Sequence, residues 1–262
     1  MVHCFRSATA TLAAAALGLA AAGCSRTAAP EFLDSSLASC VPADTVFLAG
    51  VDLDRLRAAP AYRALAPSPV GAFATASSLA LASNGKTYLL MQRGKFTETP
   101  EGATLIDSRL ALAGAPDAVR AGIAQHLSGK CGVPELLAAA SAAAQGSQIW
   151  AIARGNAALP LAGNLANLNR LFRFTDYVTF AATLDGQVEL NLSGQCPSAE
   201  AARRFEETLR ALLSLAAAAN ARQTDVASLL GSVQVRRDGL AVHATVRADA
   251  AAAGKVAGGI LR

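Results

Sequence analysis

The first 24 residues constrain this chain most, because they decide in which compartment the rest of it folds. Arg6 and the α-amino group give a short positive start, and residues 8–22 are almost entirely Ala and Leu. A charged start, an apolar run of about 7–15 residues and small residues before a cleavage point are typical of a secretory signal. The run is shorter than the roughly 20 residues of a membrane-spanning helix. We therefore expect an exported protein.

The end of this signal, Ala22-Gly23-Cys24, resembles a bacterial lipobox, where a lipoprotein precursor is acylated on Cys and cut just before it. It departs from the usual pattern at Ala21, where that family prefers Leu. The resemblance implies that Cys24 is the lipidated first residue, with diacylglyceryl and amide-linked, palmitate-type chains that together anchor the protein stably. Ser25 replaces the Asp that usually retains a lipoprotein in the inner membrane, which implies an outer-membrane protein facing the periplasm. The alternative is ordinary cleavage after Ala22, which leaves Cys24 as a thiol.

Removal of residues 1–23 from the 262-residue chain leaves 239 residues, enough for one large domain or two small ones. We predict a signal over 1–23, a mostly flexible tether over 24–44, and two α+β halves over 45–145 and 146–262. The net charge of +4 falls to +3 without Arg6. Nucleic acid is not an expected partner, because its binding requires Lys and Arg clustered on one face.

Apolar periodicity and turn residues predict the secondary structure of each half. In the first half we expect a strand over 45–53, a helix over 54–65, a hairpin over 78–93 with a tight Asn84-Gly85 turn, strands over 104–107 and 109–113, and helices over 116–127 and 134–144. In the second half we expect a strand over 148–154, a helix over 157–172, a hairpin over 177–193, a helix from Ser198 to about Ala219, and a hairpin over 232–247.

The second hairpin has a clear division between its faces. Val188, Leu190 and Leu192 alternate with polar residues at 187, 189 and 191, which predicts one buried and one hydrated face. His243 falls on the outward side of the last strand by the same rule.

The order of elements from Gln148 onward is β-α-β-β-α-β with one added strand, which is the order of the ferredoxin-like motif. The first half repeats this order approximately. Thr45 and Gln148, which begin the two leading strands, are 103 residues apart, and the turn residues Asn84 and Asp185 are 101 apart. We therefore predict an α+β fold, an antiparallel sheet backed by helices, in two ferredoxin-like halves.

The segment that opens the domain resembles the start of a group of uncharacterised bacterial exported proteins. The resemblance lies in Val41-Pro42-Ala43-Asp44, a strand, and then the pattern Leu-Arg-x-x-Pro-x-Tyr-Arg over residues 56–63. It covers about 25 residues and implies a strand followed by a helix, but no activity.

Patterns of catalytic or metal-binding residues are weak. Residues 83–86 fit the Ser-x-x-Lys motif of penicillin-binding enzymes, which needs the Ser at a helix start; the central Asn-Gly favours a hairpin tip instead. The mature chain has two histidines, His126 and His243, whereas a metal site needs three or four converging ligands. We predict no catalytic residue, metal or cofactor, although the members of a Ser-His-Asp triad need not be close in sequence.

Three cysteines follow Cys24. Cys131 and Cys196 each follow a Ser-Gly-x tripeptide just before a predicted helix, at the same expected end of the sheet. We predict a disulfide between them, worth roughly 4 kcal/mol in the chain-entropy model; the alternative is two free thiols. Cys40 has no predicted partner.

These patterns lead to three functional hypotheses. The first is a non-enzymatic, membrane-anchored module that binds an envelope protein or other partner through a sheet face or edge. The second is a carrier of an apolar ligand held between the sheet and Ala-rich helices. The third is an envelope hydrolase, which requires Ser, His and acidic side chains to converge in a cleft.

Overall fold

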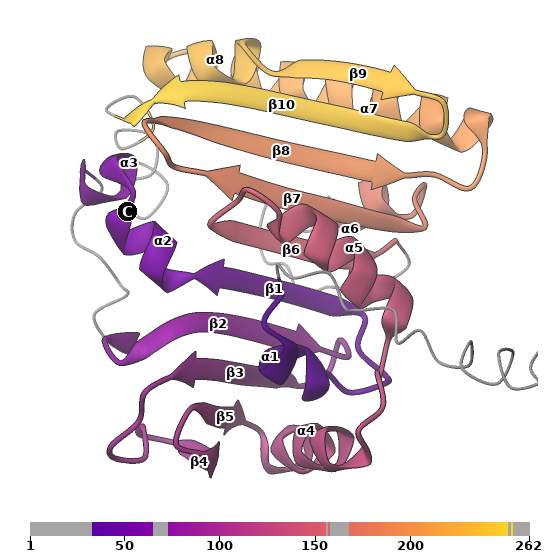
Figure 1. Cartoon of the computed structure of the whole chain (residues 1–262). Coiled ribbons are helices and arrows are strands. Elements are labelled where there is room, and N and C mark those ends of the chain that lie inside the picture. Colours follow the sequence, from indigo (N-terminus) through magenta and orange to yellow (C-terminus); the bar gives the residue numbers. More distant parts are fainter. Residues whose placement is uncertain (1–32, 65–72, 156, 158–167, 251–252, 254–262) are drawn as a thin grey trace, which may run out of the picture.

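The computed structural model describes residues 33–64, 73–155, 157, 168–250 and 253. One ten-stranded sheet organises them, in the order β4-β5-β3-β2-β1-β6-β7-β8-β10-β9, and all neighbours are antiparallel (Figure 1). The strands are β1 (Phe47–Asp52), β2 (Ala76–Ser83), β3 (Tyr88–Gly94), β4 (Ala103–Asp107), β5 (Leu110–Gly114), β6 (Ile149–Arg154), β7 (Tyr177–Thr183), β8 (Gln187–Gln195), β9 (Gln234–Asp238) and β10 (Ala241–Asp249). The helices are α1 (Ser35–Ser39), α2 (Leu53–Ala58), α3 (Pro60–Ala64), α4 (Pro116–Ser128), α5 (Pro134–Ala144), α6 (Leu168–Phe172), α7 (Ala199–Ala219) and α8 (Thr224–Gly231).

The α+β class and the antiparallel sheet are confirmed, but the strand order is not ferredoxin-like. A ferredoxin-like motif contains a βαβ crossover between parallel strands, whereas β1, β2 and β3 are consecutive antiparallel neighbours, as are β6, β7 and β8. The described helices of the connection from β1 to β2 are short: α2 and α3 meet at Pro60, and the six residues of α2 rise only about 9 Å. They pack at one end of the sheet on face B, and β2 pairs with β1 as its antiparallel neighbour.

The two halves nevertheless repeat each other outward from the centre of the sheet, where β1 pairs with β6. Ala49 lies opposite Ala151 in this central pair. The row of residues that extends from Ala49 is Leu81, Leu90, Ala113 and Ala103. The row that extends from Ala151 is Phe180, Leu192, Ala244 and Val235. The halves differ in one connection: residues 95–102 join β3 to β4, whereas α7 and α8 lie between β8 and β9.

The sheet has two faces that are covered differently. Face A is the side that carries Leu48, Met91 and Trp150; face B carries Ala49, Leu90 and Ala151. On face A, α1, α4 and α5 pack over β1, β2, β3, β5 and β6, in the front of the view in Figure 1. On face B, α6 and α7 pack over the outer strands of the second half, and α2 and α3 pack at one end. Face A of the outer second half has no helix over it in the described part of the chain.

The described part of the predicted tether is folded, not flexible. Leu33, Leu37 and Val41 are at most 8% exposed and join the core beneath face A. Leu37 is the buried residue of α1, and Leu33 and Val41 flank that helix; Asp34 caps it by accepting hydrogen bonds from the N–H groups of residues 36 and 37. The folded domain thus includes Leu33, twelve residues before the predicted start at residue 45.

The remaining predicted elements agree with the structure, with two exceptions. The hairpin of β2 and β3 is present, but four residues separate its last pair, Ser83 and Tyr88, so the loop is longer than a two-residue turn. The predicted helix over 157–172 lies mostly outside the described residues, which include only α6. The glycine-rich residues 254–259 also lie outside them. No helix within the described ranges has the length and apolarity needed to cross a membrane.

Candidate functional site

On face A, the outer strands of the first half carry apolar side chains, whereas the equivalent strands of the second half carry polar ones. In the first half, Leu89, Met91 and Leu112 are at most 2% exposed beneath the helices. Counted from the Ala49–Ala151 pair, the equivalent positions of β8 and β10 hold Asn191, Ser193 and His243. All three are partly exposed. The second half therefore presents a hydrated surface where the first half buries its core.

We call this surface the open face. It consists of the face-A side chains of β7, β8, β10 and β9: Tyr177, Thr179, Ala181, Thr183, Gln187, Glu189, Asn191, Ser193, Gln195, Gln234, Arg236, Asp238, Ala241, His243, Thr245, Arg247 and Asp249. None of them is buried. The predicted polar side of β8 and the outward position of His243 are both confirmed, because Val188, Val242 and Ala244 are buried on face B.

A chain of hydrogen bonds orders one end of the open face. Thr245 donates from Oγ1 to Oδ1 of Asn191 (2.7 Å), and Asn191 donates from Nδ2 to Glu189 (3.0 Å). Arg247 donates from Nε to the other carboxylate oxygen of Glu189 (2.6 Å). The Arg247 guanidinium, with the Asn191 amide, holds the pKa of Glu189 below its usual value, so this carboxyl stays ionised.

A groove borders the open face where α5 approaches the end of β6 and the start of β7. It has a volume of about 980 Å³. Arg154, the last residue of β6, lies opposite Tyr177, the first residue of β7, and both line the groove. The other charged side chains along it are Glu135, Arg173 and Asp176. Neither arginine forms an ion pair within the described ranges, and both are exposed.

The turn beneath the groove is built by close backbone packing. A Cβ on Gly155 would lie 1.6 Å from the carbonyl oxygen of Thr175, so only glycine fits there. Gly155 donates its N–H to the carbonyl of Asp176 (2.9 Å). The hydroxyl of Thr175, which is 7% exposed, donates to the carbonyl of Phe172 (2.7 Å). These contacts fix the segment that carries Arg173 and Asp176.

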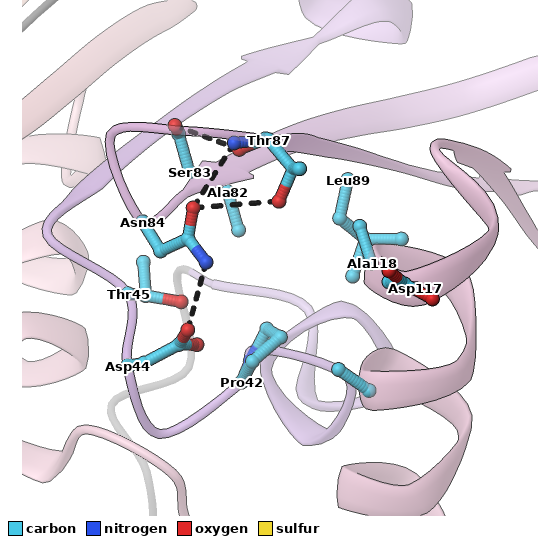
Figure 2. Close-up of a pocket in the computed structure, with 11 residues that line it drawn as sticks. Pro42, Asp44, Thr45, Ala82, Ser83, Asn84, Thr87, Leu89, Asp117 and Ala118 are labelled. Carbon is cyan, nitrogen blue, oxygen red and sulfur yellow. Dashed lines mark hydrogen bonds between the residues drawn. The ribbon is translucent and has the colours of Figure 1, made fainter.

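A second, smaller hollow of about 180 Å³ lies at the tip of the β2–β3 hairpin, where the sequence suggested a Ser-x-x-Lys motif (Figure 2). Ser83 ends β2 and is not at a helix start; its hydroxyl donates to the carbonyl of Thr87 (2.9 Å). Asn84 donates to Asp44 (2.8 Å) and accepts from Thr87, which closes the loop. The expectation of a hairpin tip is confirmed, and these polar groups are used in holding the turn.

Ser39 and His126 come together, although the sequence did not link them. Oγ of Ser39 lies 2.7 Å from Nδ1 of His126, between α1 and α4. The Ser39 hydroxyl is also 2.7 Å from the carbonyl of Ser36, so its one hydrogen has two acceptors within reach, and the direction of the Ser39–His126 bond depends on the tautomer of the imidazole. No carboxylate among the described residues bonds the other ring nitrogen. The contact joins two helices and does not favour a hydrolase.

The predicted disulfide is not formed: Cys40, Cys131 and Cys196 are free thiols. Cys131 is exposed, and its neighbour Gly132 packs against the carbonyl of Val41, just before β1. Cys196 is buried at the end of β8, and β6 and β7 lie between β1 and β8. Three strand spacings are about 14 Å, beyond the roughly 7 Å that a disulfide spans between Cα atoms. Cys24 lies outside the described residues.

Within the described ranges, no three His, Cys, Asp or Glu side chains converge as metal ligands would. Comparison of the chain with models of protein families, with characterised proteins and with solved structures gives no significant match. The open face and the groove are therefore the candidate functional surfaces of the described residues.

Proposed function

We propose that this protein is an exported, lipid-anchored protein of the bacterial envelope that binds a partner, without catalysis, through its open face. The anchor is supported by the sequence alone, through the signal and the lipobox-like Cys24. Leu33, the first described residue, is nine positions after Cys24. An extended chain of this length spans at most about 30 Å, so an acylated Cys24 holds the domain close to the membrane surface.

The observation that carries the proposal is the replacement of Met91 and Leu112 by Ser193 and His243 at equivalent positions of the sheet. An antiparallel sheet can leave one face in water when that face is polar. The second half meets this condition over four adjacent strands. A broad, polar and uncovered sheet face is a surface on which an extended partner can form many hydrogen bonds.

The edges of the sheet are less suited to binding than its open face. Arg210 of α7 donates from Nη2 to the carbonyl of Val235 (2.5 Å), which occupies one acceptor of edge strand β9. Arg236 and Arg237 are exposed on that strand, and charged residues oppose strand addition. At the other edge, the pairing of β4 is irregular between Leu105 and Asp107, and bulges have the same effect.

The border of the groove favours a polar partner over an apolar one. A carrier of an apolar ligand would need a cavity lined by apolar side chains with few polar groups. Apolar side chains such as Leu136 and Ile152 line part of the groove, but charged side chains of both signs, including Arg154 and Asp176, lie along it as well.

Site-specific photo-crosslinking in the native host tests this proposal. A photo-reactive amino acid is placed at Ser193 or His243 on the open face, and at Ser214, an exposed residue of α7, as the control. We expect adducts from the first two positions only. Equal labelling at all three positions, or none at Ser193 and His243, contradicts binding by the open face.

The anchor is tested separately by the mass of the mature protein extracted from membranes. We expect a chain that starts at Cys24 and carries acyl groups, and we expect Cys24→Ser to abolish both acylation and membrane retention. An unacylated wild-type chain in the soluble fraction would contradict the anchor while leaving the open-face proposal intact.

A further inference from the structure

The neutral side chains at the centre of the open face carry hydroxyl, amide and imidazole groups rather than large apolar ones. Thr179, Ser193 and His243 form one row across β7, β8 and β10, and Asn191 and Thr245 lie in the next row. The side chains of Ser193 and His243 have no hydrogen-bond partner among the described residues. The Thr245–Asn191–Glu189 chain already fixes its members in orientation. The face thus offers hydroxyl, amide and imidazole groups that are prearranged for a ligand.

This composition differs from that of a stable protein–protein interface. The centre of such an interface is enriched in aromatic residues and Met and is depleted of Ser, and its binding energy comes mainly from Trp, Tyr and Arg anchors. Tyr177, at the border with the groove, is the one aromatic side chain that belongs to the open face. A hydrated polymer with many hydroxyl and amide groups suits the surface better than a folded protein does.

The groove adds charged side chains of both signs beside the neutral centre of the open face. Arg154 and Arg173, which have no ion-pair partner among the residues that the structure describes, are suited to carboxylates, since a guanidinium binds a carboxylate through two parallel hydrogen bonds. Glu135 and Asp176 are acids suited to ammonium groups. A strongly anionic polymer does not fit a charge-balanced groove, whereas a chain that bears both carboxylates and amines does.

We infer that the open face and the groove bind a glycan strand that carries short peptides with free carboxylate and amino groups, the polymer of the bacterial cell wall. The N-acetylated sugars lie on the open face, across the rows of Ser193 and Asn191. The charged groups of the peptides lie in the groove: the carboxylates bind Arg154 and Arg173, and the ammonium groups bind Glu135 and Asp176. This inference rests on the proposed function and names the ligand of the same site.

Co-sedimentation of the purified mature protein with insoluble cell-wall sacculi, freed of attached proteins, tests the inference. The double variant Ser193→Met/His243→Leu has the first half's residues Met91 and Leu112 at the equivalent positions, so the sheet is expected to accept them. Ser214→Met, on α7, is the matched control. Circular dichroism and analytical ultracentrifugation show which variants remain folded and monomeric.

We expect saturable binding of the wild type, at least 10-fold weaker binding of the double variant, and unchanged binding of Ser214→Met. Arg154→Gln/Arg173→Gln, which leaves the face intact, is expected to weaken binding about 10-fold and to reduce its dependence on salt, because it removes two charge contacts. If the double variant is not folded, the single variants Ser193→Asn and His243→Ala are used in its place, and each is likewise expected to bind at least 10-fold more weakly than the wild type.

Two results overturn the inference. The first is wild-type sedimentation with sacculi no greater than with cellulose particles of equal surface. The second is equal binding by the wild type and the folded open-face variants. If, in either case, the photo-reactive residues at Ser193 and His243 still form adducts with a protein, the open face binds a protein and the proposed function stands without this ligand. If they form none, both proposals fail.

Discussion

The indole of Trp150 lies directly against Gly50, its antiparallel partner across the centre of the sheet. A Cβ on Gly50 would lie 2.3 Å from Cζ2 of Trp150. Trp150 is 5% exposed and belongs to the core beneath α5. Because β1 and β6 are the strands at which the two halves meet, this contact joins the halves into one sheet.

Gly50→Ala is expected to lower the free energy of unfolding by about 1–3 kcal/mol, the cost of overpacking a filled core. Urea unfolding followed by the fluorescence of Trp150, the only tryptophan in the chain, measures it. Gly231→Ala is the control, because a Cβ there meets no atom within 4 Å; it is expected to stay within about 0.5 kcal/mol of the wild type. Equal stabilities of the two variants would contradict the close contact.

Gln148→Leu is expected to destabilise the protein by about 1–3 kcal/mol, the cost of leaving a buried group unpaired. Gln148 is fully buried, accepts the N–H of Leu184 (2.9 Å) and donates to Asp185 (2.5 Å). Leucine fills the space but leaves the Leu184 N–H without a partner. Gln234→Leu, on exposed edge strand β9, is the control for the chemical change and is expected to cost less than about 0.5 kcal/mol. Thermal unfolding compares them.

The Asp34–Arg93 ion pair makes stability depend on pH in the acid range. Burial acts to raise the pKa of Asp34, but hydrogen bonds from Arg93 (2.9 Å) and the Ser36 N–H outweigh it, and the pKa is lowered. A lowered folded-state pKa gives stability that is fully present above the unfolded-state value of about 4 and is lost as pH falls through the folded-state value.

Asp34→Asn is therefore expected to cost about 1 kcal/mol at pH 7, and the difference from the wild type is expected to shrink as pH falls below about 4. Denaturant unfolding from pH 7 down to the lowest pH at which the fold persists measures this. A difference that stays constant, or grows, toward low pH would show that Asp34 is not ionised through this pair in the native state.

Thiol labelling tests the free cysteines. In a purified chain of residues 24–262 with Cys24→Ser, one thiol, Cys131, is expected to react with a maleimide under native conditions. Cys40 and Cys196 are fully buried, and burial raises the pKa of both thiols, which keeps them protonated and unreactive. In denaturant, without reductant, three thiols are expected to react. Mass spectrometry that finds Cys131 and Cys196 linked would instead restore the disulfide.

The local pattern of the sequence was sufficient to predict most strands and helices, because side-chain alternation and turn residues act over a few positions. Val188, Leu190 and Leu192 predicted the buried side of β8, and His243 was correctly placed on the outward side of β10. The sequence also suggested a repeat of about 102 residues, which is the separation of Ala49 and Ala151 in the central pair. It missed α8 and the folding of residues 33–44, since helix α1 has only five residues and depends on the core for its stability.

The sequence by itself determined the class of fold and the alternation of faces within each strand, because these follow from composition and short-range periodicity; its prediction of an export signal rests on the sequence alone. Only the tertiary structure decided which strands are neighbours, because strand pairing joins residues that are far apart in the chain and local periodicity does not specify it. The strand order places β6 and β7 between β1, which is near Cys131, and β8, which ends next to Cys196. The same order brings polar positions of β7, β8, β10 and β9 together on one open face. Residues as distant as Ser193 and His243 become neighbours only when the sheet is complete.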